Sequence, residues 1–182
     1  MSENFTTKDL LLWLQLPKVE AAFSKDYQSL SRDNFQAKLD NFFQEANDPL
    51  LAAVAGEIGN NSFDHNLGTW QDVTGVYFQH DANERLLTIA DRGQGIRKTL
   101  SRIIPDIKTD QEAIEIAFIQ TISGRSPEQR GNGLKFVAAA VRDNNWELDF
   151  RSGNGLVLIK NGTMSFDQAV QPIYGCVAFL KY

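Results

Sequence analysis

The side chains most suited to chemistry lie in one short stretch, GEIGNNSFDHN, at residues 56–66 of a segment that otherwise has the pattern of a buried helix. Each helical residue advances by about 100°, so Asn61 and Asp64 lie within about 40° of Glu57 around the helix axis. Asn60 lies about 60° away, on the same stripe. Solvent-exposed helix faces usually carry Lys and Glu, and Asn is a poor helix-interior residue. The alternative is a solvated helix face. The composition, with a carboxylate one turn before an amide, favours a ligand site instead.

A second polar segment, ADRGQGI at residues 90–96, follows a predicted strand. Asp91 comes directly after the apolar run LLTIA. Gly93 and Gly95 let the backbone turn tightly and approach a ligand closely. A turn that simply ends a strand would use the same residues, so this segment alone is a weak indication of a site.

A third polar segment, RGNGLKFVAAA at residues 130–140, places two glycines before a predicted helix. The unpaired N–H groups of a first helical turn favour an anion. Arg125 and Arg130 lie upstream and Lys135 lies just inside the helix, so all three are candidates for binding negative charge. An ordinary helix start is the alternative, because the segment matches neither the P-loop nor the dinucleotide-binding fingerprint.

These three segments need helices and strands to position them. Apolar residues at helical spacing, together with a cap at Asn47 or Asp48 before Pro49 and the Thr109-x-x-Glu112 capping box, predict helices at 10–16, 34–47, 49–66, 113–122 and 133–143. Strand-like runs predict strands at 73–81, 84–91, 146–152, 155–162 and 174–182, the first two joined by a hairpin at 81–83. The order predicts an α+β fold, a two-layer sandwich with helices on one face of a mixed or antiparallel sheet.

Composition and charge limit the classes of protein. The 182 residues predict one domain with a substantial core. The net charge of −5 argues against general binding to nucleic acid or an anionic membrane, although it permits one anionic ligand. Cys176 is the single cysteine, which excludes a disulfide within the chain and predicts a small buried hydrophobe. The absence of a signal sequence or long apolar run predicts a cytoplasmic protein.

The order of the three segments resembles the GHKL ATP-binding superfamily. That superfamily includes gyrase-type topoisomerases, the ninety-kilodalton heat-shock chaperone, mismatch-repair ATPases, sensor histidine kinases and anti-sigma-factor serine kinases. Glu57 and Asn61 match its N box, the segment at 91–95 matches its first glycine box, and the segment at 131–133 matches its second. The resemblance implies a GHKL-type ATP-binding domain at 49–182, preceded by an N-terminal helical extension at 1–48.

The resemblance also implies roles. Asn61 would hold Mg²⁺ through its side-chain oxygen, with phosphates and waters completing the coordination shell. Glu57 would orient or deprotonate the attacking water or hydroxyl, and Asp91 would accept a hydrogen bond from the adenine amino group. Residues 97–130 would form a lid over ATP. The expected nucleotide-binding residues are Asn61, Asp91, Gly93, Gly95, Ile96, Arg130, Gly131, Asn132, Gly133 and Leu134.

A few residues indicate which branch of the superfamily the chain resembles most. Neither histidine, His65 nor His80, lies in the N-terminal helical region, so an autophosphorylating sensor kinase is not expected. His65 has no second His or Cys at ligand spacing, which favours packing or hydrogen bonding over a metal role. Because Glu57 occupies the first N-box position of a stand-alone domain, the chain is most similar to the anti-sigma-factor serine kinases. The long N-terminal helices depart from that pattern.

Three hypotheses follow for function. The first is a Mg²⁺-dependent ATP hydrolase or protein serine/threonine kinase that acts on a protein partner. The second is a protein-interaction switch in which ATP or ADP sets the affinity for a partner without significant turnover. The third is a structural protein that retains the three boxes as relics.

The aromatic residues of the N-terminal region are expected to be mostly core, with a homodimer or partner surface as the alternative; they are Trp13, Phe23, Phe42 and Phe43.

Overall fold

A five-stranded antiparallel sheet forms the centre of the molecule, with its strands in the order β1-β2-β3-β5-β4. The computed structural model describes residues 6–120 and 132–182. The strands are β1 (Gln28–Ser29), β2 (Val76–Asp81), β3 (Leu86–Asp91), β4 (Glu147–Lys160) and β5 (Thr163–Lys181). The helices are α1 (Thr7–Gln15), α2 (Arg32–Ala46), α3 (Pro49–Asn66), α4 (Gly95–Leu100), α5 (Asp110–Ile119) and α6 (Gly133–Asp143).

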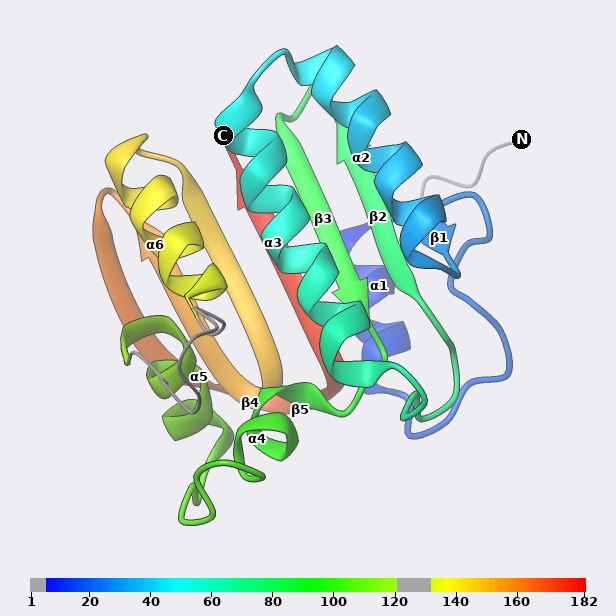
Figure 1. The fold of residues 1–182 in the computed structure, drawn as a ribbon. Helices are drawn as coiled ribbons and strands as arrows, with labels where there is room; N and C mark the ends of the chain where they lie inside the picture. The colour runs from blue at the N-terminus through cyan, green and yellow to red at the C-terminus, as the bar shows by residue number, and fades with distance from the viewer. Residues whose placement is uncertain (1–5, 121–131) are drawn as a thin grey trace.

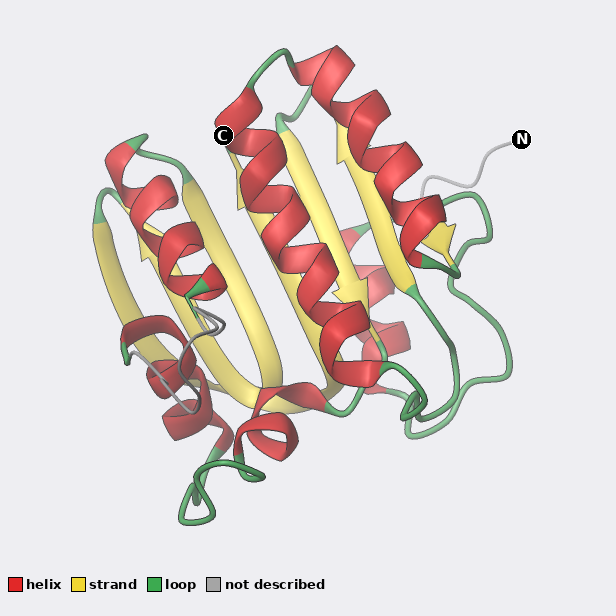
Figure 2. Ribbon diagram, viewed as in Figure 1, coloured by secondary structure: helices red, strands yellow, loops and turns green. Residues whose placement is uncertain are grey.

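The helices form a layer on one face of this sheet. Figure 1 shows α2, α3 and α6 side by side across that face, and Figure 2 shows the same layer in front of the strands. The main hydrophobic core lies between the two layers and includes Phe35 of α2, Val54 of α3 and Val137 of α6. The predicted α+β fold is therefore confirmed, and the sheet is antiparallel rather than mixed.

One helix covers the opposite face of the sheet. Leu10 and Leu14 of α1 pack against Tyr77, Val177 and Phe179 in a second buried cluster. Figure 1 shows α1 behind the sheet. The fold thus has a small third layer beside the two that the sequence predicts.

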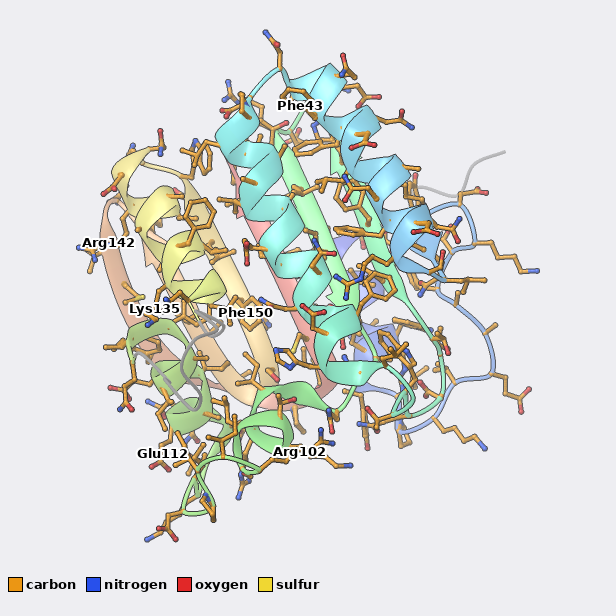
Figure 3. The ribbon with its side chains drawn as sticks, viewed as in Figure 1. Phe43, Arg102, Glu112, Lys135, Arg142 and Phe150 are labelled. Carbon is orange, nitrogen blue, oxygen red and sulfur yellow. The ribbon has the colours of Figure 1, made fainter. Side chains whose placement is uncertain are left out.

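The N-terminal aromatic residues divide between core and surface. Phe42 is buried in the main core, and Trp13 and Phe23 pack against the α1 cluster with ring centroids 5.9 Å apart. Phe43, labelled in Figure 3, is exposed on α2. Because α2 shares its core with α3, the segment before residue 49 packs directly against the helix that carries the first polar stretch.

Local capping sets the ends of two helices as the sequence predicts. Asp48 caps α3, because its Oδ1 accepts the N–H groups of Leu50 and Leu51, each over 3.0 Å. Thr109 caps α5 by accepting the N–H of Glu112. The Glu112 carboxylate accepts the N–H of Lys108 in return, one residue before the cap itself.

The prediction of three C-terminal strands is wrong, because β4 and β5 are two long strands. β4 continues through the segment where a break was expected, and its pairing with β5 shifts register around Gly153. Gly153 adopts φ +59°, which makes a β-bulge without ending the strand. The chain turns only at Asn161-Gly162, and the predicted strand at 174–182 is the end of β5.

In the described ranges 6–120 and 132–182, no helix has both the length and the apolar character needed to cross a membrane.

Candidate functional site

A cavity of about 870 Å³ opens between α3, α4 and α6 above the ends of β3 and β5. Small-molecule sites commonly have volumes of ~300–1,000 Å³. All three polar segments contribute to the lining of this cavity. The predicted site residues that line it are Glu57, Asn61, Asp91, Gly95, Ile96, Asn132, Gly133 and Leu134.

The polar stripe of α3 faces the start of α6. A Cβ atom at Gly133 would lie only 2.5 Å from Glu57 Oε2 and 3.6 Å from Asn61 Nδ2. Glycine therefore allows the first turn of α6 to approach the carboxylate and the amide closely. The other two residues of the stripe, Asn60 and Asp64, bind the side chain of Arg32 instead.

Asp91 places a buried carboxylate at the base of the cavity, where its residue is only 4% exposed. Its Oδ2 accepts the Ser62 hydroxyl over 2.7 Å, and its Oδ1 accepts the Gly93 N–H over 2.7 Å. The Asn66 amide approaches Oδ1 at 3.4 Å. Burial raises the pKa of Asp91 above its ordinary value, and the bonds from Ser62 and Gly93 partly offset that rise.

The turn after Asp91 packs tightly on the end of α3. A Cβ atom at Gly93 would lie 2.1 Å from the Asn66 amide, so only glycine fits there. Gly95 adopts φ +77°, a conformation that glycine adopts without strain. The backbone N–H of Gln94 donates to Asn66 Oδ1 over 2.8 Å, and the Gln94 side chain donates to the His65 carbonyl. The turn thus has a defined position relative to α3.

Some predicted residues do not line the cavity. Gly93 lies within the turn but not in the lining of the cavity, and its carbonyl accepts from the Gln71 side chain over 2.9 Å. Lys135, labelled in Figure 3, lies in the first turn of α6 but does not line the cavity. Arg125, Arg130 and Gly131 lie outside the described residues, as does the lid segment from residue 121 onward.

Several lining residues are missing from the sequence-based prediction. Ser62 and Asn66 have helical i, i+4 spacing with Ile58, and this polar pair within an apolar stripe is a signal that the sequence contains. Phe150, labelled in Figure 3, contributes an aromatic ring from β4. Arg32 contributes a cation from α2, and no local sequence pattern connects it with α3.

Cys176 also lines the cavity, paired across β3 and β5 with Asp91. Burial strongly raises the pKa of its thiol, so the thiol stays protonated and behaves as a small hydrophobe. Its sulfur lies 3.5 Å from the Ser152 hydroxyl, which in turn accepts the Ile96 N–H over 2.9 Å.

The side-chain oxygens that line the cavity are compatible with a Mg²⁺ ion that is coordinated mainly by oxygen atoms of a bound ligand and of water. No group of three or more His, Cys, Asp or Glu side chains with metal-binding geometry occurs in the described part of the chain. Asn61 offers one amide oxygen in the cavity, next to the exposed carboxylate of Glu57. Mg²⁺ commonly takes few protein ligands and completes its shell with phosphates and waters, so one amide is compatible with it.

Comparisons with known proteins find similarity to solved structures, and the one described here is modest. No protein-family model matches the sequence, and no curated protein matches it. Among solved structures, the chain is similar to the 43K ATPase domain of Thermus thermophilus gyrase B, determined in complex with an aminocoumarin, with a TM-score of 0.44 and 19% identity. The similarity covers 70% of this chain and 32% of that one, so the chain spans about a third of its length. No functional conclusion follows from a similarity of this size.

Proposed function

We propose that the chain binds Mg²⁺-ATP in the cavity between α3, α4 and α6, in the manner of the GHKL superfamily. The observation that carries the proposal is the convergence of three separate sequence segments on one cavity of ligand size. The three segments lie far apart in the chain but each contributes residues to this one surface, namely Glu57 and Asn61, then Asp91, Gly95 and Ile96, and then residues 132–134. A solvated helix face, a strand-ending turn and an ordinary helix start would have no reason to meet.

Asp91 supports the binding of adenine at the base of the cavity. Its carboxylate already accepts the Ser62 hydroxyl, the Gly93 N–H and a backbone N–H from Cys176, and the Asn66 amide approaches it at 3.4 Å. The exocyclic amino group of adenine would replace the contact from Asn66, which at 3.4 Å is the longest of these hydrogen bonds. Guanine presents an oxygen at the same ring position, which would repel the carboxylate, so the site would discriminate between the two bases.

The α6 side of the cavity supports binding of the phosphates. The first turn of α6, at Asn132 and Gly133, offers backbone N–H groups and the positive end of the helix dipole. Asn61 would hold Mg²⁺, which when bound neutralises phosphate charge. Glu57, one turn before Asn61, would orient or deprotonate the attacking water or hydroxyl. The reaction would be ATP hydrolysis or transfer of phosphate to a serine or threonine of a protein partner.

A nucleotide-dependent interaction switch is the second candidate, and one observation favours it. Asp91 faces the cavity, whereas the next residue, Arg92, binds the carbonyl groups of Trp13 and Leu16 at the end of α1. A backbone shift at Asp91 on nucleotide binding would therefore be passed through Arg92 to the end of α1. In this alternative, ATP and ADP would give different affinities for a protein partner.

The test is ADP production from Mg²⁺-ATP by the wild-type chain and by Glu57→Ala, after nucleotide binding has been measured for both. We expect Glu57→Ala to keep ATP binding and to lose turnover by about 10²–10⁴-fold, the usual contribution of a general base. Glu84→Ala, which removes an exposed carboxylate in the β2–β3 turn, is the matched control. ATP binding without turnover in either protein would favour the switch, and absence of ATP binding would refute the proposal.

A further inference from the structure

Arg32, the first residue of α2, extends its side chain to the polar stripe of α3. Its Nη2 lies 2.5 Å from Asp64 Oδ1, and its Nη1 donates to Asn60 Oδ1 over 3.1 Å. The guanidinium carbon lies 5.7 Å from the centre of the Phe63 ring. Three side chains of α3 thus fix the guanidinium plane at the wall of the cavity, which Arg32 itself lines.

The side chains that line the cavity carry more negative than positive charge, so the position of the Arg32 guanidinium matters for binding an anion. Among the described residues that line the cavity, Glu57, Asp64 and Asp91 carry carboxylates. Arg32 is the one lysine or arginine in that same set. A triphosphate carries several negative charges, and like charges at short distance repel strongly where water is partly excluded. A cation with a fixed orientation at the cavity wall would offset that repulsion.

The ion pair between Arg32 and Asp64 is poorly explained as a device for stability. The two side chains are 49% and 53% exposed, and ion pairs in such positions contribute little to stability. The guanidinium group also has more N–H donors than its bonds to Asp64 and Asn60 use. The remaining donors are available to a ligand in the cavity.

We propose that Arg32 binds phosphate oxygens of the nucleotide, and that Asp64 and Asn60 are positioning residues that orient its guanidinium group. The planar arrangement of donors suits phosphate, which it can bind through two parallel hydrogen bonds. This inference rests on the proposed binding of ATP. It assigns part of the phosphate site to the segment before residue 49, which lies outside the ATP-binding domain that the resemblance implies.

The test compares dissociation constants of the full chain for Mg²⁺-ATP and for adenosine, measured by titration calorimetry. We expect Arg32→Gln to weaken ATP binding by about tenfold or more, as loss of charged hydrogen bonds usually does, and to leave adenosine binding unchanged. Arg32→Lys, which keeps the charge but loses the planar donors, should give an intermediate loss. Arg142→Gln is the matched control, because Arg142 bonds only the Gly162 carbonyl among its described partners and lies outside the cavity.

Each outcome has a distinct meaning. Wild-type affinity of Arg32→Gln for ATP would overturn the inference while leaving the proposed function intact. Equal losses of ATP and adenosine binding would also overturn it, because they would indicate a structural role. Absence of both ATP and adenosine binding in the wild-type chain would refute the proposed function, and the inference would fall with it. Thermal melting of each variant verifies that it is folded.

Discussion

At the scale of single residues, the site depends on a carboxylate kept in an unfavourable environment. Asp91 is buried at the end of β3, and burial raises the pKa of its carboxyl group. Ser62 and Gly93 stabilise the ionised form through short hydrogen bonds but do not restore the ordinary pKa. An apolar residue at this position would leave the buried donors of Ser62 and Gly93 without an acceptor, so the carboxylate has a structural role beside the proposed contact with a ligand.

The raised pKa of Asp91 predicts a pH dependence of stability. A carboxyl whose pKa is higher in the folded than in the unfolded chain contributes stability below its unfolded pKa. That contribution is lost as the pH rises through the folded pKa. Asp91→Asn removes it, so the free energy of unfolding of wild type relative to Asp91→Asn should rise as the pH is lowered from about 7 to about 4.

Urea unfolding of both proteins across this pH range measures the difference. Each unit by which the folded and unfolded pKa values differ corresponds to ~1.4 kcal/mol. Asp106→Asn, which removes an exposed carboxylate, is the matched control. If the free energy of unfolding of wild type minus that of Asp91→Asn stays constant or falls as the pH is lowered, the assigned direction of the Asp91 pKa is wrong.

At the scale of elements, the position of α3 depends on close contact with α2. A Cβ atom at Gly59 would lie 2.1 Å from Phe35 Cζ. Phe35 is fully buried, and its ring packs against Phe63 and Phe78 with centroids 6.1 Å and 5.8 Å away. The ring therefore has no space into which to move. Gly59 allows the two helices to approach, and this contact sets the distance of Arg32 from the polar stripe.

We expect Gly59→Ala to lower the free energy of unfolding by about 1–3 kcal/mol, because the added methyl group overpacks a rigid core. Gly56→Ala is the control on the same helix. A Cβ atom there would lie 3.2 Å from Leu39 Cδ2, the end of a more flexible side chain. Its cost should be smaller and partly offset by the ~1 kcal/mol higher helix propensity of alanine. Equal effects of the two substitutions in urea unfolding would contradict the close approach at Gly59.

At the scale of the whole molecule, one arginine connects the sheet to α1 on its far face. Arg92 is 1% exposed and forms an ion pair with Asp72, with Nη2 to Oδ2 at 2.8 Å. Its guanidinium also donates to the carbonyl oxygens of Trp13 and Leu16, each over 2.7 Å. The rings of Trp13 and Tyr174 lie 5.0 Å and 5.4 Å from its guanidinium carbon. The turn beside the cavity thus holds the N-terminal helix directly.

We expect Arg92→Met to lower the free energy of unfolding by about 3–5 kcal/mol, because it leaves the Asp72 side chain buried without its cationic partner, with only the N–H groups of Val19 and Val73 as donors. Amide hydrogen exchange in α1 should accelerate more than in α6 if the helix is released. Arg151→Met is the control, since its pair with Asp149 is partly exposed and should cost about 1 kcal/mol or less. Unchanged exchange in α1 would show that other contacts suffice to hold the helix.

The sequence by itself determines the local features of this protein. The start of α3 at Asp48-Pro49, the cap of α5 at Thr109 and the β2–β3 hairpin each depend on residues a few positions apart. Hydrophobic periodicity likewise indicates which face of a helix is buried. The three polar segments are recognisable for the same reason, because their residue types and spacing lie within a few positions.

Only the tertiary structure decided how these segments meet. The contact of Arg32 with Asp64 spans 32 residues, and the contact of Arg92 with Trp13 spans 79, so no local pattern predicts either. The glycines of β4 have the pattern of a break, but pairing with β5 keeps the strand continuous through a bulge. β1 and α4 are too short for periodicity to indicate them. Contacts between distant segments depend on packing of the complete chain, which a local pattern does not contain.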